Sequence, residues 1–180
     1  MACSGDVFKN YFTVGENNMT SWTFREMYNK FCDSSTTVNP NDIPFIIWLL
    51  ENPKSLFHLH GACDLHKHDL IHVLLDVGQS NDDEAFVIGF TMGNDKRISP
   101  WEVKFFKYVS SKFYPLKNRF NDKQLKIFDK GFEYGRSRHY NNIARFDWNS
   151  IDWDLPFYDI QYKFGIFDNE LDYYKTQLGV

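Results

Sequence analysis

The sequence predicts an all-α protein built as a single-domain helical bundle. Apolar residues recur at spacings of three and four along most of the chain, whereas the alternation typical of strands is scarce. The 180 residues are 43% hydrophobic and 18% aromatic, which suits one sizeable core. No internal repeat, low-complexity tract or glycine-rich linker divides the chain, so we expect residues 1–180 to form one domain.

Two helices are expected in the first third of the chain. The first begins near Thr20 and breaks at the polar stretch 33–41, and its apolar face comprises Phe24, Met27, Tyr28 and Phe31. The second is short and buried, over residues 43–53. Pro44 suits its first turn, and Pro53 closes it because the residue before a proline avoids helical angles.

The next two predicted helices contain most of the chain's histidine and carboxylate chemistry. Asp64 caps a helix over 65–77, which Gly78 ends in a left-handed conformation. Residues 80–83 resemble a capping box ahead of an almost continuously apolar helix over 84–92, which ends at Gly93. The metal motif described below lies within 64–92.

Two further helices follow, and the rest of the chain is less regular. Ser99-Pro100-Trp101-Glu102 starts a helix that runs to Pro115, with a core face expected at Phe105, Phe106, Val109 and Phe113. Asn121 starts another, which stops at Gly135 and has a shared face of Leu125, Phe128 and Phe132. Residues 146–180 form a less regular segment, in which 146–167 fits either a short helix or extended chain around the core.

Charge and cysteine content narrow the class of protein. The net charge of -4 disfavours nucleic acid as a partner. Cys3, Cys32 and Cys63 are odd in number and far apart, which favours a reducing compartment. We see no targeting segment at the start, and the longest apolar run, 43–50, is far short of the ~20 residues that span a bilayer. A cytoplasmic protein without a membrane span is expected.

Four residues form a candidate metal site. His68 and His72 are one helical turn apart, so both imidazoles point the same way from a face that otherwise carries core residues. Asp69 follows His68 and serves either as a ligand or as a carboxylate that orients an imidazole. Glu84 lies on the next helix, after a turn short enough to bring it back against both histidines. This mixed donor set suits zinc, iron or manganese.

Simpler interpretations stay open. The two histidines fit ordinary core or surface positions, and Glu84 fits an acid that favours the positive end of the helix dipole. We expect structural roles for His58, His60 and His66. The alternative is that they act as replacement ligands or proton shuttles. The basic stretches 110–112 and 117–119 suit solvated surface, with contact to an anion or lipid headgroup as the alternative.

The spacing of these four residues resembles a family signature. His68-Asp69, two spacers, His72, eleven spacers and Glu84 resemble the motif of the coenzyme Q (ubiquinone) biosynthesis protein four family. A second, weaker likeness covers 155–166, a proline followed by an acidic and basic helix that ends in glycine and isoleucine. This chain looks like a short, divergent member, because residues 76–78 read Asp-Val-Gly where the family commonly has Gly-Leu-Pro.

The resemblance implies a ligand set, a cavity and partners. His68, Asp69, His72 and Glu84 would be both metal ligands and catalytic residues. The metal would be divalent, zinc first, with iron, manganese and magnesium as alternatives. An apolar cavity would hold a prenylated aromatic or isoprenoid lipid. The protein would sit peripherally at a membrane surface, with other quinone-biosynthesis enzymes as partners. Apart from the resemblance, a homodimer is an expected assembly.

Three functions follow as expectations. The first is a metal-binding protein of ubiquinone or prenyl-quinone biosynthesis that binds a polyprenylated ring precursor and catalyses its oxidative decarboxylation. The second is a non-enzymatic prenyl-lipid carrier or a scaffold for quinone-pathway enzymes. The third is a metal-dependent phosphohydrolase of the HD type, whose additional ligands would have to come from His58, His60 or Asp152.

Overall fold

Helices make up the regular structure of the computed structural model, which describes residues 22–34, 59–167, 171–172 and 176. They are α1 (Phe24–Asp33), α3 (Leu65–Leu74), α4 (Asn81–Asn94), α5 (Pro100–Lys112), η4 (Leu116–Asn118), α6 (Asp122–Ser137), η5 (Ile143–Arg145), η6 (Trp148–Ser150) and α7 (Phe157–Phe164). In these ranges strand-like pairing is limited to one bridge, between Thr23 and Pro156. The predicted all-α, single-domain fold is confirmed, while the helix expected over 43–53 lies outside the described residues.

The helices begin where side chains can satisfy their first backbone N–H groups. Asp64 accepts from Lys67 N at the start of α3. Ser80 and Asn121 form capping boxes at α4 and α6, and Ser99 does so at α5. These capping residues are the ones that the sequence analysis predicts, because a cap depends on residues only a few positions apart.

The helix ends differ from the prediction. The helix expected over 65–77 ends at Leu74, and Asp76, with φ 50°, takes the left-handed position assigned to Gly78. Asp76 N donates to Val73 O and Val77 N to His72 O, which is the hydrogen-bond pattern of a Schellman motif. Aspartate is among the residues that tolerate this conformation. The helix expected over 84–92 begins at Asn81 and ends at Asn94.

The closest helix packing in the described structure is between α4 and α6. Both helices carry the pattern F-x-x-G-F-x-x-G, at 86–93 and 128–135. A Cβ on Gly89 would lie 2.2 Å from Phe128 O, and one on Gly131 would lie 2.2 Å from Phe86 O. The helices run parallel, and the glycines let the backbones approach to this distance. Gly135 therefore belongs to this contact, and α6 continues past the predicted stop to Ser137.

The core face predicted for α5 is partly wrong. Phe106 and Val109 are buried as expected, but Phe105 is 39% exposed and Phe113 is 53% exposed. The buried face is completed by polar residues, Glu102 and Ser110. Hydropathy misled the prediction because aromatic residues occur on both faces of this helix.

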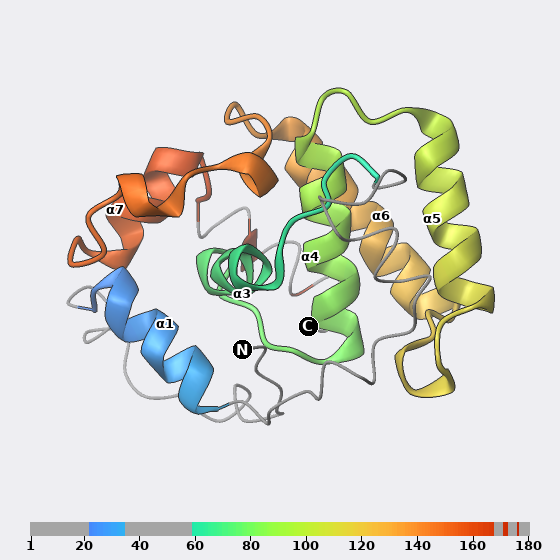
Figure 1. The fold of residues 1–180 in the computed structure, drawn as a ribbon, viewed down its shortest axis with the longest axis horizontal. Coiled ribbons are helices and arrows are strands. Elements are labelled where there is room, and N and C mark those ends of the chain that lie inside the picture. The colour runs from blue at the N-terminus through green and yellow to red at the C-terminus, as the bar shows by residue number, and fades with distance from the viewer. Residues whose placement is uncertain (1–21, 35–58, 168–170, 173–175, 177–180) are drawn as a thin grey trace.

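Helix α3 lies at the centre of the molecule, with α1 and α7 on one side and α4 on the other (Figure 1). Phe24 N donates to Leu155 O and Phe157 N to Trp22 O, which ties the start of α1 to the start of α7. The region 146–167 thus contains 3-10 turns and the helix α7, which begins after Pro156. Within the described ranges, we find no helix long and apolar enough to cross a membrane.

Candidate metal centre

Helix α3 presents the two motif histidines side by side. His68 and His72 are one turn apart, with ring centroids 4.6 Å apart and ring planes at 67°. The His72 side chain is 1% exposed, and that of His68 is 20% exposed. Phe31 of α1 packs over the His72 ring at a centroid distance of 5.7 Å, so α1 forms one wall of the site.

The turn after α3 fixes the orientation of His72. The left-handed residue Asp76 reverses the chain and brings the Gly78 carbonyl to 2.6 Å from His72 Nδ1. Nδ1 is therefore the nitrogen that donates, since a carbonyl can only accept. Nε2 is buried and has no hydrogen-bond partner. A backbone carbonyl that holds one imidazole nitrogen while the other faces a metal is a common arrangement in metal sites.

Glu84 completes the group from the first turns of α4. Asp83, not Glu84, forms the capping box, since its carboxylate accepts from Ser80 N and Oγ. Glu84 is therefore left to face α3, with Oε2 3.6 Å from His68 Nε2 and Oε1 3.4 Å from His72 Nε2. Asp83 thus caps α4, and the adjacent Glu84 is left for the proposed coordination.

The geometry of the group fits a metal ion. One donor atom from each of His68, His72 and Glu84 lies within 4.8 Å of the other two, which identifies a group that could hold an ion. Two donors that each lie about 2.1 Å from a tetrahedral ion are about 3.4 Å apart. The two nitrogen–oxygen distances of 3.4 and 3.6 Å are close to that value and longer than good hydrogen bonds.

Burial and mutual charge set the protonation of these groups. Burial, supported by the neighbouring His72, lowers the pKa of His68 to about 4, although Glu84 opposes the change. Burial alone would raise the pKa of Glu84, but the two histidines outweigh it and lower that pKa. Burial likewise opposes the charged form of His72, and Glu84 outweighs it, which raises the pKa of His72. At neutral pH the group therefore contains a neutral imidazole and an ionised carboxylate.

Asp69 is not one of the three converging donors. Its side chain is buried, and Oδ2 has no hydrogen-bond partner. Burial raises the pKa of Asp69 to about 7, with the charge of His72 acting in the opposite direction. The structure therefore brings together three of the four predicted residues and leaves Asp69 as a buried carboxyl that interacts electrostatically with His72.

The other histidines occupy structural positions. The His60 ring and backbone N contact Glu102 Oε1 at 2.8 and 3.1 Å, and His66 Nδ1 lies 3.1 Å from Tyr28 Oη. Asp152 is exposed and accepts from Asp154 N. None of these groups lies with His68, His72 and Glu84, and His58 lies outside the described residues. The additional ligands required by the phosphohydrolase hypothesis are therefore absent from this part of the chain.

Sequence reasoning missed two features that shape the site: Phe31, which packs against the His72 ring, and the Gly78 carbonyl, which is hydrogen-bonded to His72 Nδ1. The sequence places Phe31 on the apolar face of its helix, but nothing local indicates that this face reaches α3. No protein-family model, curated protein or solved structure matches the chain. The function must therefore be argued from the site and its motif.

Proposed function

We propose that the protein binds a divalent metal ion through His68, His72 and Glu84. The observation that carries the proposal is the convergence of three donor atoms, among them a buried His72 Nε2 without a hydrogen-bond partner. Two imidazoles and one carboxylate are a donor set found in catalytic zinc sites, which keep a fourth position for water or substrate. Zinc is therefore the first choice, and the imidazoles argue against magnesium, which prefers oxygen ligands.

Each of the chain's own groups has a defined task in this proposal. The Gly78 carbonyl holds the His72 ring so that Nε2 faces the ion, and ionised Glu84 offsets the ion's positive charge. His68, whose pKa is low, offers its lone pair without having to lose a proton at neutral pH. Asp69 acts either as a further ligand or as the carboxylate that tunes His72.

For the activity, we propose a role in prenyl-quinone biosynthesis, on the strength of the motif described above. The substrate would be a prenylated aromatic acid whose ring carboxylate leaves as carbon dioxide and is replaced by hydroxyl. The hydroxyl oxygen would come from water, and the two electrons released would reduce dioxygen to hydrogen peroxide or pass to another two-electron acceptor. A bound ion would polarise an oxygen of that substrate and stabilise the charge that develops as carbon dioxide leaves. Because zinc has no redox chemistry, a centre that itself took part in the oxidation would contain iron or manganese.

The first experiment is elemental analysis of protein purified without an affinity-tag metal step. Wild type and His66→Gln, a control outside the cluster, should each contain about one ion per chain. The double variant His68→Ala/His72→Ala should contain no ion. Glu84→Gln should bind the ion about 10- to 100-fold more weakly than wild type. Equal metal content in all four proteins, each folded by circular dichroism, would overturn the proposed site.

A second experiment addresses the activity. Solvent extraction and mass spectrometry of the purified protein should recover a prenylated molecule, and incubation with a prenylated hydroxybenzoate and dioxygen should release carbon dioxide. Retained lipid without turnover under any electron acceptor would instead support the carrier. Full turnover by Glu84→Gln would contradict the assigned role of the metal centre.

A further inference from the structure

A pocket opens between the end of α5 and the start of α6, beside the connection that contains η4. It has a volume of about 760 Å³, which is within the range of small-molecule binding sites. The residues that line it are Ser111, Lys112, Leu116, Arg119, Phe120, Asn121, Asp122 and Leu125. None of them belongs to the metal centre, so the pocket is a separate candidate for a binding site.

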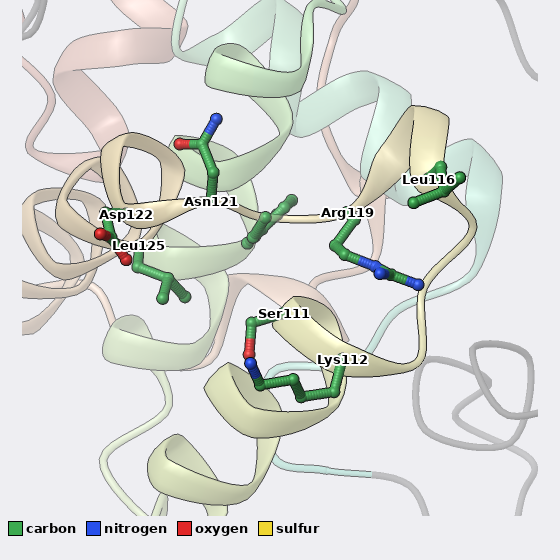
Figure 2. Close-up of a pocket in the computed structure, with 8 residues that line it drawn as sticks. Ser111, Lys112, Leu116, Arg119, Asn121, Asp122 and Leu125 are labelled. Carbon is green, nitrogen blue, oxygen red and sulfur yellow. The ribbon is translucent and has the colours of Figure 1, made fainter.

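Three charged side chains line this pocket, two basic and one acidic. Lys112 reaches in from the end of α5 and Arg119 from the connection that follows, whereas Asp122 is the first residue of α6 (Figure 2). Among the described residues, none of the three forms an ion pair. Arg119 donates from Nε and Nη2 to Tyr114 O, which holds the guanidinium and leaves further N–H groups to donate. The pocket therefore offers charges of both signs to an occupant.

The opposite charges are separated across the pocket. Figure 2 shows Arg119 and Leu116 on one side and Asp122 and Leu125 on the other. The buried ring of Phe120 also lines the pocket, so apolar surface accompanies the charged groups. An occupant that satisfies the whole lining has an anionic group at one end, a cationic group at the other and an apolar group between them.

Simpler ligands satisfy only part of this lining. A lone anion leaves the Asp122 carboxylate without a partner, and a metal ion is repelled by the two basic groups. An α-amino acid carries both charges on a single carbon, whereas Arg119 and Asp122 lie on opposite sides of the pocket. The ends of an extended dipeptide are up to about 7 Å apart, the length of two residues of chain. A short peptide therefore fits the lining better than any of these.

We propose that this pocket binds a short zwitterionic peptide with apolar side chains. The terminal carboxylate pairs with Lys112 and Arg119, and a guanidinium is well suited to a carboxylate because it donates from several N–H groups in one plane. The terminal ammonium pairs with Asp122, and an apolar side chain packs on Phe120. This inference goes beyond the proposed function and does not depend on the metal centre.

The test is an NMR titration of isotope-labelled protein with the dipeptide Leu-Leu and two derivatives, N-acetyl-Leu-Leu and Leu-Leu amide. Each derivative lacks one of the two terminal charges. Leu-Leu should shift the backbone amide signals of residues that line the pocket, between 111 and 125. Each derivative should bind about three- to five-fold more weakly than Leu-Leu, which is the effect of losing one exposed ion pair.

Variants of the protein assign each terminal charge to its partner. Asp122→Asn should bind Leu-Leu and N-acetyl-Leu-Leu equally, because the ammonium then has no carboxylate to pair with. Lys112→Gln/Arg119→Gln should likewise bind Leu-Leu and its amide equally. All three positions are exposed, and α6 keeps its capping residue Asn121, so these variants are expected to fold.

Matched controls lie outside the pocket. Lys104 is exposed on α5, and Asp159 is an exposed acid in the first turn of α7. Lys104→Gln and Asp159→Asn should keep both preferences of wild type, as should His68→Ala/His72→Ala, which separates this inference from the proposed metal function. The absence of any shifted signal with Leu-Leu, or equal binding of all three peptides by wild type, would overturn the proposal. So would tighter binding of inorganic phosphate than of Leu-Leu, because the pocket would then be a simple anion site.

Discussion

Replacement of Gly89 by alanine tests the tight packing that positions α4. In an open helix position this change stabilises a protein by about 1 kcal/mol, because alanine is the better helix former. Here the new Cβ would lie 2.2 Å from Phe128 O, whereas ordinary contacts begin at 3.4 Å. The obstacle is backbone and cannot rotate away, so α4 and α6 would have to separate by about 1 Å.

The expected net effect is a loss of about 2 kcal/mol in the free energy of unfolding. Overpacking of this kind costs about 1–3 kcal/mol or more, and helix propensity offsets only part of it. Gly131→Ala should behave alike, since its Cβ would lie 2.2 Å from Phe86 O. The double variant should lose less than the sum of the two, because one separation of the helices relieves both contacts.

Urea unfolding followed by far-UV circular dichroism gives the measurement. Lys126→Ala, at an exposed position of α6, is the control and should change stability by no more than about 0.5 kcal/mol. A Gly89→Ala variant that is as stable as wild type, or more stable, would refute the reasoning. Strictly additive losses in the double variant would refute the shared separation of the helices.

Two further predictions concern carboxylates. Burial opposes ionisation of Glu102, but hydrogen bonds from Ser99 and His60 outweigh it and lower its pKa from 4.5 to about 2. Ionised Glu102 therefore contributes about 3 kcal/mol to the free energy of unfolding. This contribution is complete above pH 4.5 and is lost as the pH falls toward 2. In urea unfolding measured at a series of pH values, Glu102→Gln should reduce this loss of stability between pH 4.5 and 2. A loss as large as that of wild type would contradict the assignment. Asp69→Asn should keep one ion per chain at saturating metal and weaken binding less than Glu84→Gln, as measured by competition with a chelator. Complete loss of metal from folded Asp69→Asn would identify Asp69 as a ligand.

Local signals in the sequence were enough for the helix starts and for most of the site. Asp64, Ser80 and Asn121 cap helices through residues a few positions away, so neighbouring sequence specifies them. His68 and His72 share a face because helical spacing alone requires it. The return of Glu84 depended on a short turn, which the chain does form, although through Asp76 and not through Gly78.

Three features depend on the tertiary structure, because each brings together groups that are far apart in the chain. The exposed side of α5, the reciprocal contact of α4 with α6 and the position of Phe31 over His72 all depend on which faces meet. Hydropathy cannot rank two aromatic faces of one helix, so Phe105 and Phe113 were predicted wrongly. The separation of Asp69 from the three donors has the same origin. A residue one position along a helix points about 100° away from its neighbour, and only the packing of α3 shows which direction faces Glu84.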